Sequence, residues 1–179
     1  MMNSELLKGL NEHLKLEFRA AHEYLAMSVW LSANDLPGFS KWMRQQSSDE
    51  LTHAQRIIDH LLERDQQPVL PAIPAPPKTW KSIEALCLHV LKNEKEVTAS
   101  INELYAVAEK AKDRPAVVML QWFVSEQMEE EANARAVLGR IRLAGNAGVG
   151  LLMVDQELAS GSVPGAPVDM AQVWAWTVF

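Results

Sequence analysis

The sequence predicts an all-α fold: a four-helix bundle with one long crossover connection, followed by a short C-terminal fifth helix. Three observations lead to this fold class. Long stretches lack Gly and Pro, apolar residues in these stretches recur with the helical period of 3.6, and a single segment is dense in proline. The 179 residues are enough for one domain, and an apolar content of 48% excludes a wholly disordered chain.

Four windows consist mainly of good helix formers and contain almost no helix breaker. They cover residues 3–33, 39–66, 78–112 and 116–138; the first contains one Gly, and the other three contain neither Gly nor Pro. The apolar period is clear in the third window, at Leu86, Val90, Val97, Ile101, Leu104 and Ala108. Each window therefore predicts one amphipathic helix.

Local signals set the ends of the helices. A tight turn at residues 34–38 separates the first two, and Pro37 suits the first turn of the second helix. Asp113 is placed to cap the fourth, with Pro115 just inside it. Gly145 is a C-terminal stop signal, after which residues 149–159 predict the short fifth helix.

The connection at residues 67–79 differs from the other turns because it holds five prolines. An extended segment of this kind covers ~3.1 Å per residue, so it reaches ~40 Å. That distance matches a helix of about 28 residues, which is ~42 Å long. The segment can therefore run the length of the bundle, which makes the second and third helices parallel.

Charge and cysteine content narrow the possible partners and the cellular compartment of the protein. The net charge of −6 disfavours a nucleic-acid partner, since phosphate contact needs a positive surface. A single cysteine, Cys87, rules out an intrachain disulfide and fits a reducing compartment. No secretory signal and no apolar run of ~18 residues is visible, so we expect a cytoplasmic protein without a membrane partner.

Each of the four predicted helices carries an acidic residue near its middle. These positions are Glu17, Glu50, Glu94 and the acidic run at 126–131, with Tyr24 on the face of Glu17 and His53 one turn after Glu50. Carboxylates that converge inside a bundle repel one another, and a cation removes that cost. Carboxylates with one imidazole suit iron, manganese or zinc. Each motif alone is common on solvated helix faces, but their joint placement predicts a two-metal centre.

Three motifs resemble those of bacterial non-haem ferritins. They are EFRAAHEYLAM at residues 17–27, ELTHA at 50–54 and LQWFVSEQMEEE at 120–131, and the likeness extends from about residue 7 to residue 160. The resemblance implies a ferritin-like bundle with a di-iron centre. Glu17, Glu50 and His53 would hold the first iron, and Glu50 would bridge to a second iron held by Glu94 and Glu130.

The resemblance also implies roles for neighbouring side chains. Gln127 would lie beside the iron pair as a hydrogen-bond partner of the site, and Tyr24 would hydrogen-bond to the site and supply an electron. A third, more exposed iron site would consist of Asp49, Glu126, Glu129 and Glu130. The family usually has Glu at the position of Asp49, and the shorter side chain alters the geometry of that site.

The activity implied is that of a ferroxidase, which oxidises Fe²⁺ with O₂ and deposits ferric mineral in a hollow homo-oligomeric shell of twenty-four subunits. Iron storage and detoxification would be its function. The alternative is a non-catalytic shell subunit, or a plain helical bundle, whose carboxylates nucleate mineral. The joint presence of Glu17, Tyr24, Glu50, His53 and Glu94 favours the ferroxidase.

Other members of the wider class fit less well. Bacterioferritins place a haem-ligating Met in the stretch where this chain has Thr52, so no haem is expected, and no His follows His89 to complete a second Glu-x-x-His motif. The remaining histidines, His13, His22, His60 and His89, are expected to be surface or structural residues.

The predicted domain covers residues 1–161, and residues 162–179 form a tail. The tail contains Trp174, Trp176 and Phe179 after a Pro/Gly-rich linker. It would pack on its own shell, stay disordered or dock a partner, and the sequence does not choose among these.

Overall fold

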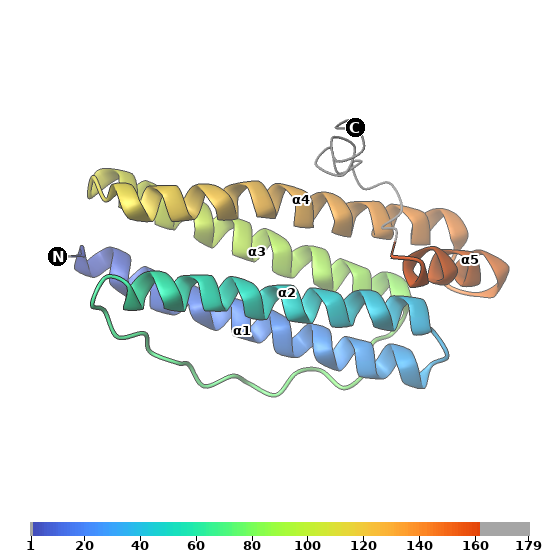
Figure 1. Ribbon diagram of the computed structural model, residues 1–179. Coiled ribbons are helices and arrows are strands. Elements are labelled where there is room, and N and C mark those ends of the chain that lie inside the picture. The colour runs from blue at the N-terminus through green and yellow to red at the C-terminus, as the bar shows by residue number, and fades with distance from the viewer. Residues whose placement is uncertain (1, 162–179) are drawn as a thin grey trace, which may run out of the picture.

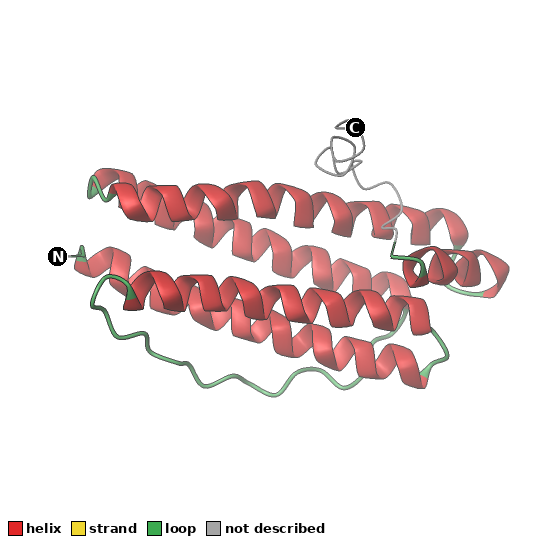
Figure 2. Cartoon of the chain, viewed as in Figure 1, coloured by secondary structure: helices red, strands yellow, loops and turns green. Residues whose placement is uncertain are grey.

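The computed structural model describes residues 2–161, which form five α-helices and no strand (Figure 1, Figure 2). The helices are α1 (Ser4–Ala33), α2 (Pro37–Leu62), α3 (Ile83–Lys110), α4 (Arg114–Ala144) and α5 (Gly148–Ala159). Helices α1 to α4 form a bundle, and α5 lies at one of its ends (Figure 1). The predicted fold class is confirmed, while the predictions for residues 162–179 fall outside the described part of the chain.

Several helix ends differ from the sequence windows by a few residues. Helix α2 begins at Pro37, as predicted from the fit of proline to the first turn, where its missing N–H needs no partner, and it ends at Leu62 rather than at residue 66. Helix α3 begins only at Ile83, where the Ser82 side chain caps it. Helix α4 continues through Gly139 to Ala144, since one glycine costs a helix only about 1 kcal/mol and packing offsets that cost.

The proline-rich connection runs the length of the bundle, as predicted (Figure 1). It leaves the end of α2 and returns to the opposite end of the molecule, where α3 starts. Helices α2 and α3 therefore point the same way. The Val69 N–H donates to Asn11 Oδ1 at 2.7 Å, which fixes the connection to α1.

Helix α5 is docked on the first turn of α2. The backbone N–H of Phe39 donates to Asp155 Oδ1 at 2.9 Å, so a buried carboxylate of α5 satisfies a donor at the start of α2. Gly38 permits this contact, because a Cβ there would lie only 1.7 Å from the Asp155 carbonyl oxygen. One carboxylate and one missing side chain thus help to fix α5, together with the burial of Leu151, Val154 and Leu158 in the core.

A polar layer divides the core of the bundle. One apolar cluster gathers around Met27, Phe39 and Val137, and the other around Leu10, Ile57 and Ile101. Between them, along each helix, lie the buried polar residues His13, Glu17, Glu50, His53, Glu94, Gln127 and Glu130. Because buried charges are costly without partners, this layer is the first place to look for function.

Within residues 2–161, no helix is both long enough and apolar enough to cross a membrane.

Candidate metal centre

The α1 contribution to the polar layer is Glu17 and Tyr24, both completely buried. Seven residues separate them, which is two helical turns, so both side chains face the interior. The sequence predicted this shared face.

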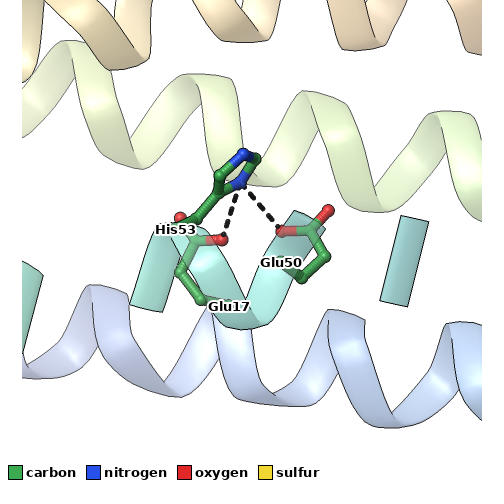
Figure 3. A group of neighbouring side chains, drawn as sticks. All are labelled: Glu17, Glu50 and His53. Carbon is green, nitrogen blue, oxygen red and sulfur yellow. Dashed lines mark ion pairs between the residues drawn. The ribbon is translucent and has the colours of Figure 1, made fainter. Parts of the chain in front are cut away.

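The α2 contribution is Glu50 and His53, which lie three residues apart and face α1. His53 Nδ1 is 3.4 Å from Glu50 Oε2 and 3.6 Å from Glu17 Oε2 (Figure 3). One donor atom from each of Glu17, Glu50 and His53 lies within 4.8 Å of the other two. Within residues 2–161 this is the one set of three His, Cys, Asp or Glu side chains that meets so closely.

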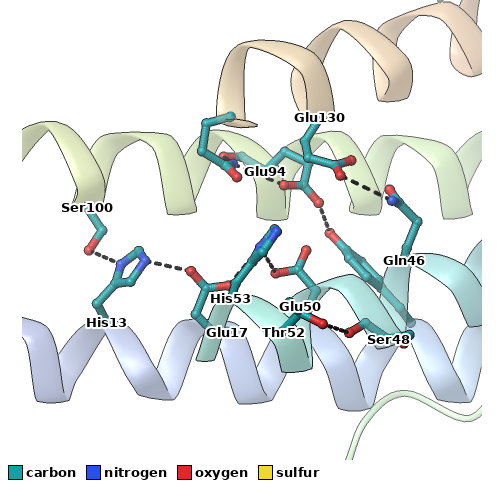
Figure 4. A network of polar contacts seen from close by, with 12 residues as sticks. His13, Glu17, Gln46, Ser48, Glu50, Thr52, His53, Glu94, Ser100 and Glu130 are labelled. Atoms are coloured by element: carbon teal, nitrogen blue, oxygen red, sulfur yellow. Dashed lines mark hydrogen bonds and ion pairs between the residues drawn. The ribbon is translucent and has the colours of Figure 1, made fainter. Parts of the chain in front are cut away.

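Helices α3 and α4 supply Glu94 and Glu130 from the other side of the layer (Figure 4). Neutral donors hold both carboxylates. The Tyr24 hydroxyl and Gln127 Nε2 donate to Glu94, the latter at 3.1 Å, and Gln46 Nε2 donates to Glu130 Oε1 at 3.4 Å. The predicted residues Tyr24 and Gln127 therefore both contact Glu94, and Gln46 is a contact that the sequence did not predict.

The carboxylates of this layer carry more negative charge than their surroundings neutralise. Burial raises the pKa of Glu50 well above its usual range, and the negative charges of Glu94 and Glu17 raise it further. Burial, and then the Glu94 charge, raise the pKa of Glu130 to about 8. Burial likewise raises the pKa of Glu94, although its bonds from Tyr24 and Gln127 oppose the shift.

Glu17 behaves differently because it has basic neighbours. Burial alone would raise its pKa, but the charge and hydrogen bond of His13 and a hydrogen bond from His53 outweigh burial, so the net shift is downward. The same contact with Glu17 raises the pKa of His53, against the opposing effect of its burial.

Four carboxylate oxygens in the layer are buried without a well-aligned hydrogen bond: both oxygens of Glu17, which lie against two histidine rings, and Oε2 of Glu50 and of Glu130. Such atoms need either a proton or a cation. A set of carboxylates with one imidazole nitrogen matches the donors that iron prefers, so the residues present fit iron.

The proposed third-site residues lie to one side of this centre. Asp49 and Glu126 are half-buried, and Glu129 is exposed. All three, with Glu130, line a cavity of about 450 Å³ between α2 and α4. Gln45 Nε2 donates to Asp49 Oδ1 at 2.9 Å. The third site stays a prediction.

The four histidines expected to be surface or structural residues divide into two groups. His22 is exposed, His60 is buried beside Arg64, and His89 contacts Glu23 at 3.0 Å. His13 instead lies inside the polar layer, fully buried, with Nε2 at 2.7 Å from Glu17 Oε1. Its position four residues before Glu17 was the available signal, because residues at i and i+4 meet on one helix face.

Comparisons with known proteins agree on one family. The ferritin-like domain model matches residues 7–144. A bacterial non-heme ferritin of Escherichia coli is 34% identical over 160 residues, covering 89% of this chain and 97% of the relative. A bacterial non-heme ferritin of Campylobacter jejuni is 36% identical over 156 residues, covering 87% and 93%. The crystal structure of an open pore ferritin from Archaeoglobus fulgidus superposes with a TM-score of 0.86 at 37% identity, covering 89% of this chain and 98% of that one.

Proposed function

The chain belongs to the ferritin-like family, and we propose that it oxidises Fe²⁺ with O₂ at the centre inside its bundle and stores the ferric product in a hollow shell of its own copies. The observation that carries the proposal is the convergence of Glu17, Glu50 and His53 within 4.8 Å, opposite Glu94 and Glu130. Two Fe²⁺ ions each give up one electron, and one O₂ with two protons takes up both electrons as H₂O₂.

The side chains divide the work of holding two irons. Glu17 and His53 bind one, Glu94 and Glu130 bind the other, and Glu50 lies between them. Tyr24 and Gln127 donate to Glu94 and so fix its orientation. Carboxylate ligands stabilise the ferric state more than the ferrous state, because their negative charge compensates the extra positive charge of Fe³⁺. Oxidation is favoured for that reason.

The third site and the shell complete the proposal. Asp49, Glu126 and Glu129 receive iron along the cavity wall that they share with Glu130, between the centre and the surface of the α2–α4 face. Residues 1–161 form the iron-handling domain, and twenty-four copies form the shell. Support for the shell comes from the relatives, which are named as ferritins.

The test is stopped-flow absorbance of ferric iron after the metal-free protein is mixed with Fe²⁺ in air-saturated buffer. We expect a fast phase that saturates at two Fe²⁺ per chain. Glu50→Gln should lose that phase, because the carboxylate between the two irons becomes a neutral amide. Glu63→Gln is the matched control: it removes an exposed carboxylate at the end of the same helix and should retain the fast phase.

The alternative is a shell subunit whose carboxylates only nucleate mineral. It predicts slow oxidation, no faster than in buffer, and no difference between the two variants. That result would exclude the ferroxidase while leaving the assembly of the shell to be measured separately by light scattering.

A further inference from the structure

Both nitrogens of the completely buried His13 ring lie close to a polar atom of another residue. Nε2 lies 2.7 Å from Glu17 Oε1, and Nδ1 lies 2.8 Å from Ser100 Oγ on α3 (Figure 4). The Phe123 ring meets the imidazole edge-on at a centroid distance of 6.1 Å. Contacts from α1, α3 and α4 therefore fix the ring, so its Nε2 is held in one place beside Glu17.

The two oxygens of Glu17 face different partners. Oε1 faces His13, and Oε2 faces His53 Nδ1 at 3.6 Å. His13 is not among the three residues whose donor atoms gather within 4.8 Å. The imidazole of His13 thus lies behind Glu17, on the side away from Glu50 and His53.

From this geometry we propose that His13 is a positioning residue, which holds Oε1 of Glu17 by a hydrogen bond and so leaves Oε2 alone to bind the first iron. The inference rests on the proposed function, because it assigns a coordination mode to one ligand of that centre. Its chemical basis is general: hydrogen bonds from outer residues to a ligating carboxylate set the orientation of that ligand. Ser100 acts one step further out, because it holds the other nitrogen of the ring.

The test uses Co²⁺, which binds to oxygen and nitrogen ligands, is not oxidised by the centre, and shows coordination number in its visible absorption spectrum. His13→Leu removes the donor and frees Glu17 to bind with both oxygens. We expect Co²⁺ affinity, measured by calorimetry, to fall about ten-fold, at the lower end of the range for lost outer-shell partners. We also expect the visible bands to weaken as the coordination number rises.

His13→Gln is the conservative variant, since its amide N–H reaches in the same direction. It should restore both the affinity and the spectrum. Ser100→Ala keeps the imidazole and removes its anchor, so a smaller change in the same direction is expected. His89→Leu is the matched control, because it breaks another His–Glu contact of α1, with Glu23, outside the polar layer, and should leave the Co²⁺ spectrum unchanged.

Each other outcome overturns the proposal. A His13→Leu protein with the Co²⁺ affinity and spectrum of the parent shows that His13 only fills space. Loss of one whole equivalent of Co²⁺ shows that His13 is itself a ligand. If His13→Leu does not fold, His13→Gln and Ser100→Ala decide: a spectrum unchanged in Ser100→Ala together with one altered in His13→Gln contradicts the donor role.

Failure of the proposed function gives a different pattern. If the bundle holds no metal centre, the parent protein itself binds no Co²⁺ there, and Glu50→Gln and His13→Leu show the same lack of binding. If instead Glu50→Gln loses Co²⁺ and His13→Leu does not, the centre stands and only the role of His13 falls.

Discussion

Two clusters of carboxylates and histidine each include a glutamate of α1, and they differ in how their negative charges are compensated. The inner cluster consists of Glu17, Glu50, His53, Glu94 and Glu130 in the polar layer of the core. The outer cluster consists of Arg19, Glu23, His89, Asn93 and Glu96 on the α1–α3 face. Glu17 and Glu23 are six residues apart on one helix, yet their surroundings have opposite effects.

In the outer cluster the carboxylate of Glu23 is well supplied with donors. His89 Nε2 lies 3.0 Å and Asn93 Nδ2 2.8 Å from Glu23 Oε2, and Arg19 is 4.0 Å from Oε1. Burial raises the pKa of Glu23, but these contacts outweigh it and the net shift is downward. In the inner cluster the carboxylate oxygens outnumber the side chains that donate to them, and buried oxygens stay without a hydrogen bond. A His–Glu contact alone thus does not indicate a metal site; a deficit of donors does.

The largest expected difference between the clusters is in the response to metal. Zn²⁺ at about 100 times its dissociation constant should stabilise the metal-free parent by about 2.7 kcal/mol. Glu23→Gln should show the same gain, because its site is already neutralised. Glu17→Gln should show almost none, because it loses a proposed ligand. Differential scanning calorimetry with and without Zn²⁺ measures all three, and an equal gain in both variants would remove the distinction between the clusters.

The sequence predicts the inner cluster in part: it predicts positions that share one helix better than positions that depend on packing between helices. The helices follow from period and breakers, and the pairs Glu17–Tyr24 and Glu50–His53 follow from spacing within one helix. Glu94 was singled out as the mid-helix acid of the third helix, but the choice of Glu130 within the acidic run at 126–131 depended on resemblance. Packing between helices decides which face of α4 turns inward, and the run itself does not show it.

The same limit explains His13 and His89. Both were expected to be surface or structural residues. His13 became part of the inner layer because Ser100, on a different helix, offers a partner to its second nitrogen. His89 became a partner of Glu23 because α1 and α3 pack side by side. Such partners lie far apart in the chain, and only the fold brings them together.

The pH dependence of stability should have opposite signs in the two clusters when metal is absent. The pKa of Glu130 is raised to about 8 from 4.5, so its protonated form stabilises the fold at low pH, and that stability is lost as pH rises toward 8. Glu130→Gln removes the loss. Above pH 8 this variant should melt above the parent by a few degrees, given about 2–4 °C per kcal/mol for a chain of this size, and the difference should vanish near pH 4.5.

Glu23→Gln is the counterpart. The pKa of Glu23 is lowered below 4.5, so its ionised form stabilises the fold above that pH, and the contribution is lost as pH falls through the shifted pKa. At pH 8 the free energy of unfolding of the variant should be lower than that of the parent by about 1 kcal/mol. This is the contribution of a hydrogen-bonded charge, reduced because Glu23 is partly exposed. Thermal melts in chelator from pH 4 to 9 measure both. Shifts of the same sign at pH 8 would contradict the assigned difference in donors.

The smallest effect is expected at the rim of the outer cluster. Arg19 binds Glu96 through two nitrogens, at 2.9 and 3.3 Å, but the Glu96 side chain is 44% exposed. Exposed ion pairs contribute about 0.2–1 kcal/mol and weaken with salt. Arg19→Gln and Glu96→Gln should therefore each cost about 0.5 kcal/mol. A double-mutant cycle at low and high salt separates this pair from the half-buried Glu23. If the Arg19–Glu96 coupling energy persists in high salt, the whole outer cluster is shielded from water. The two clusters would then differ in the number of their hydrogen-bond donors rather than in how deeply they are buried.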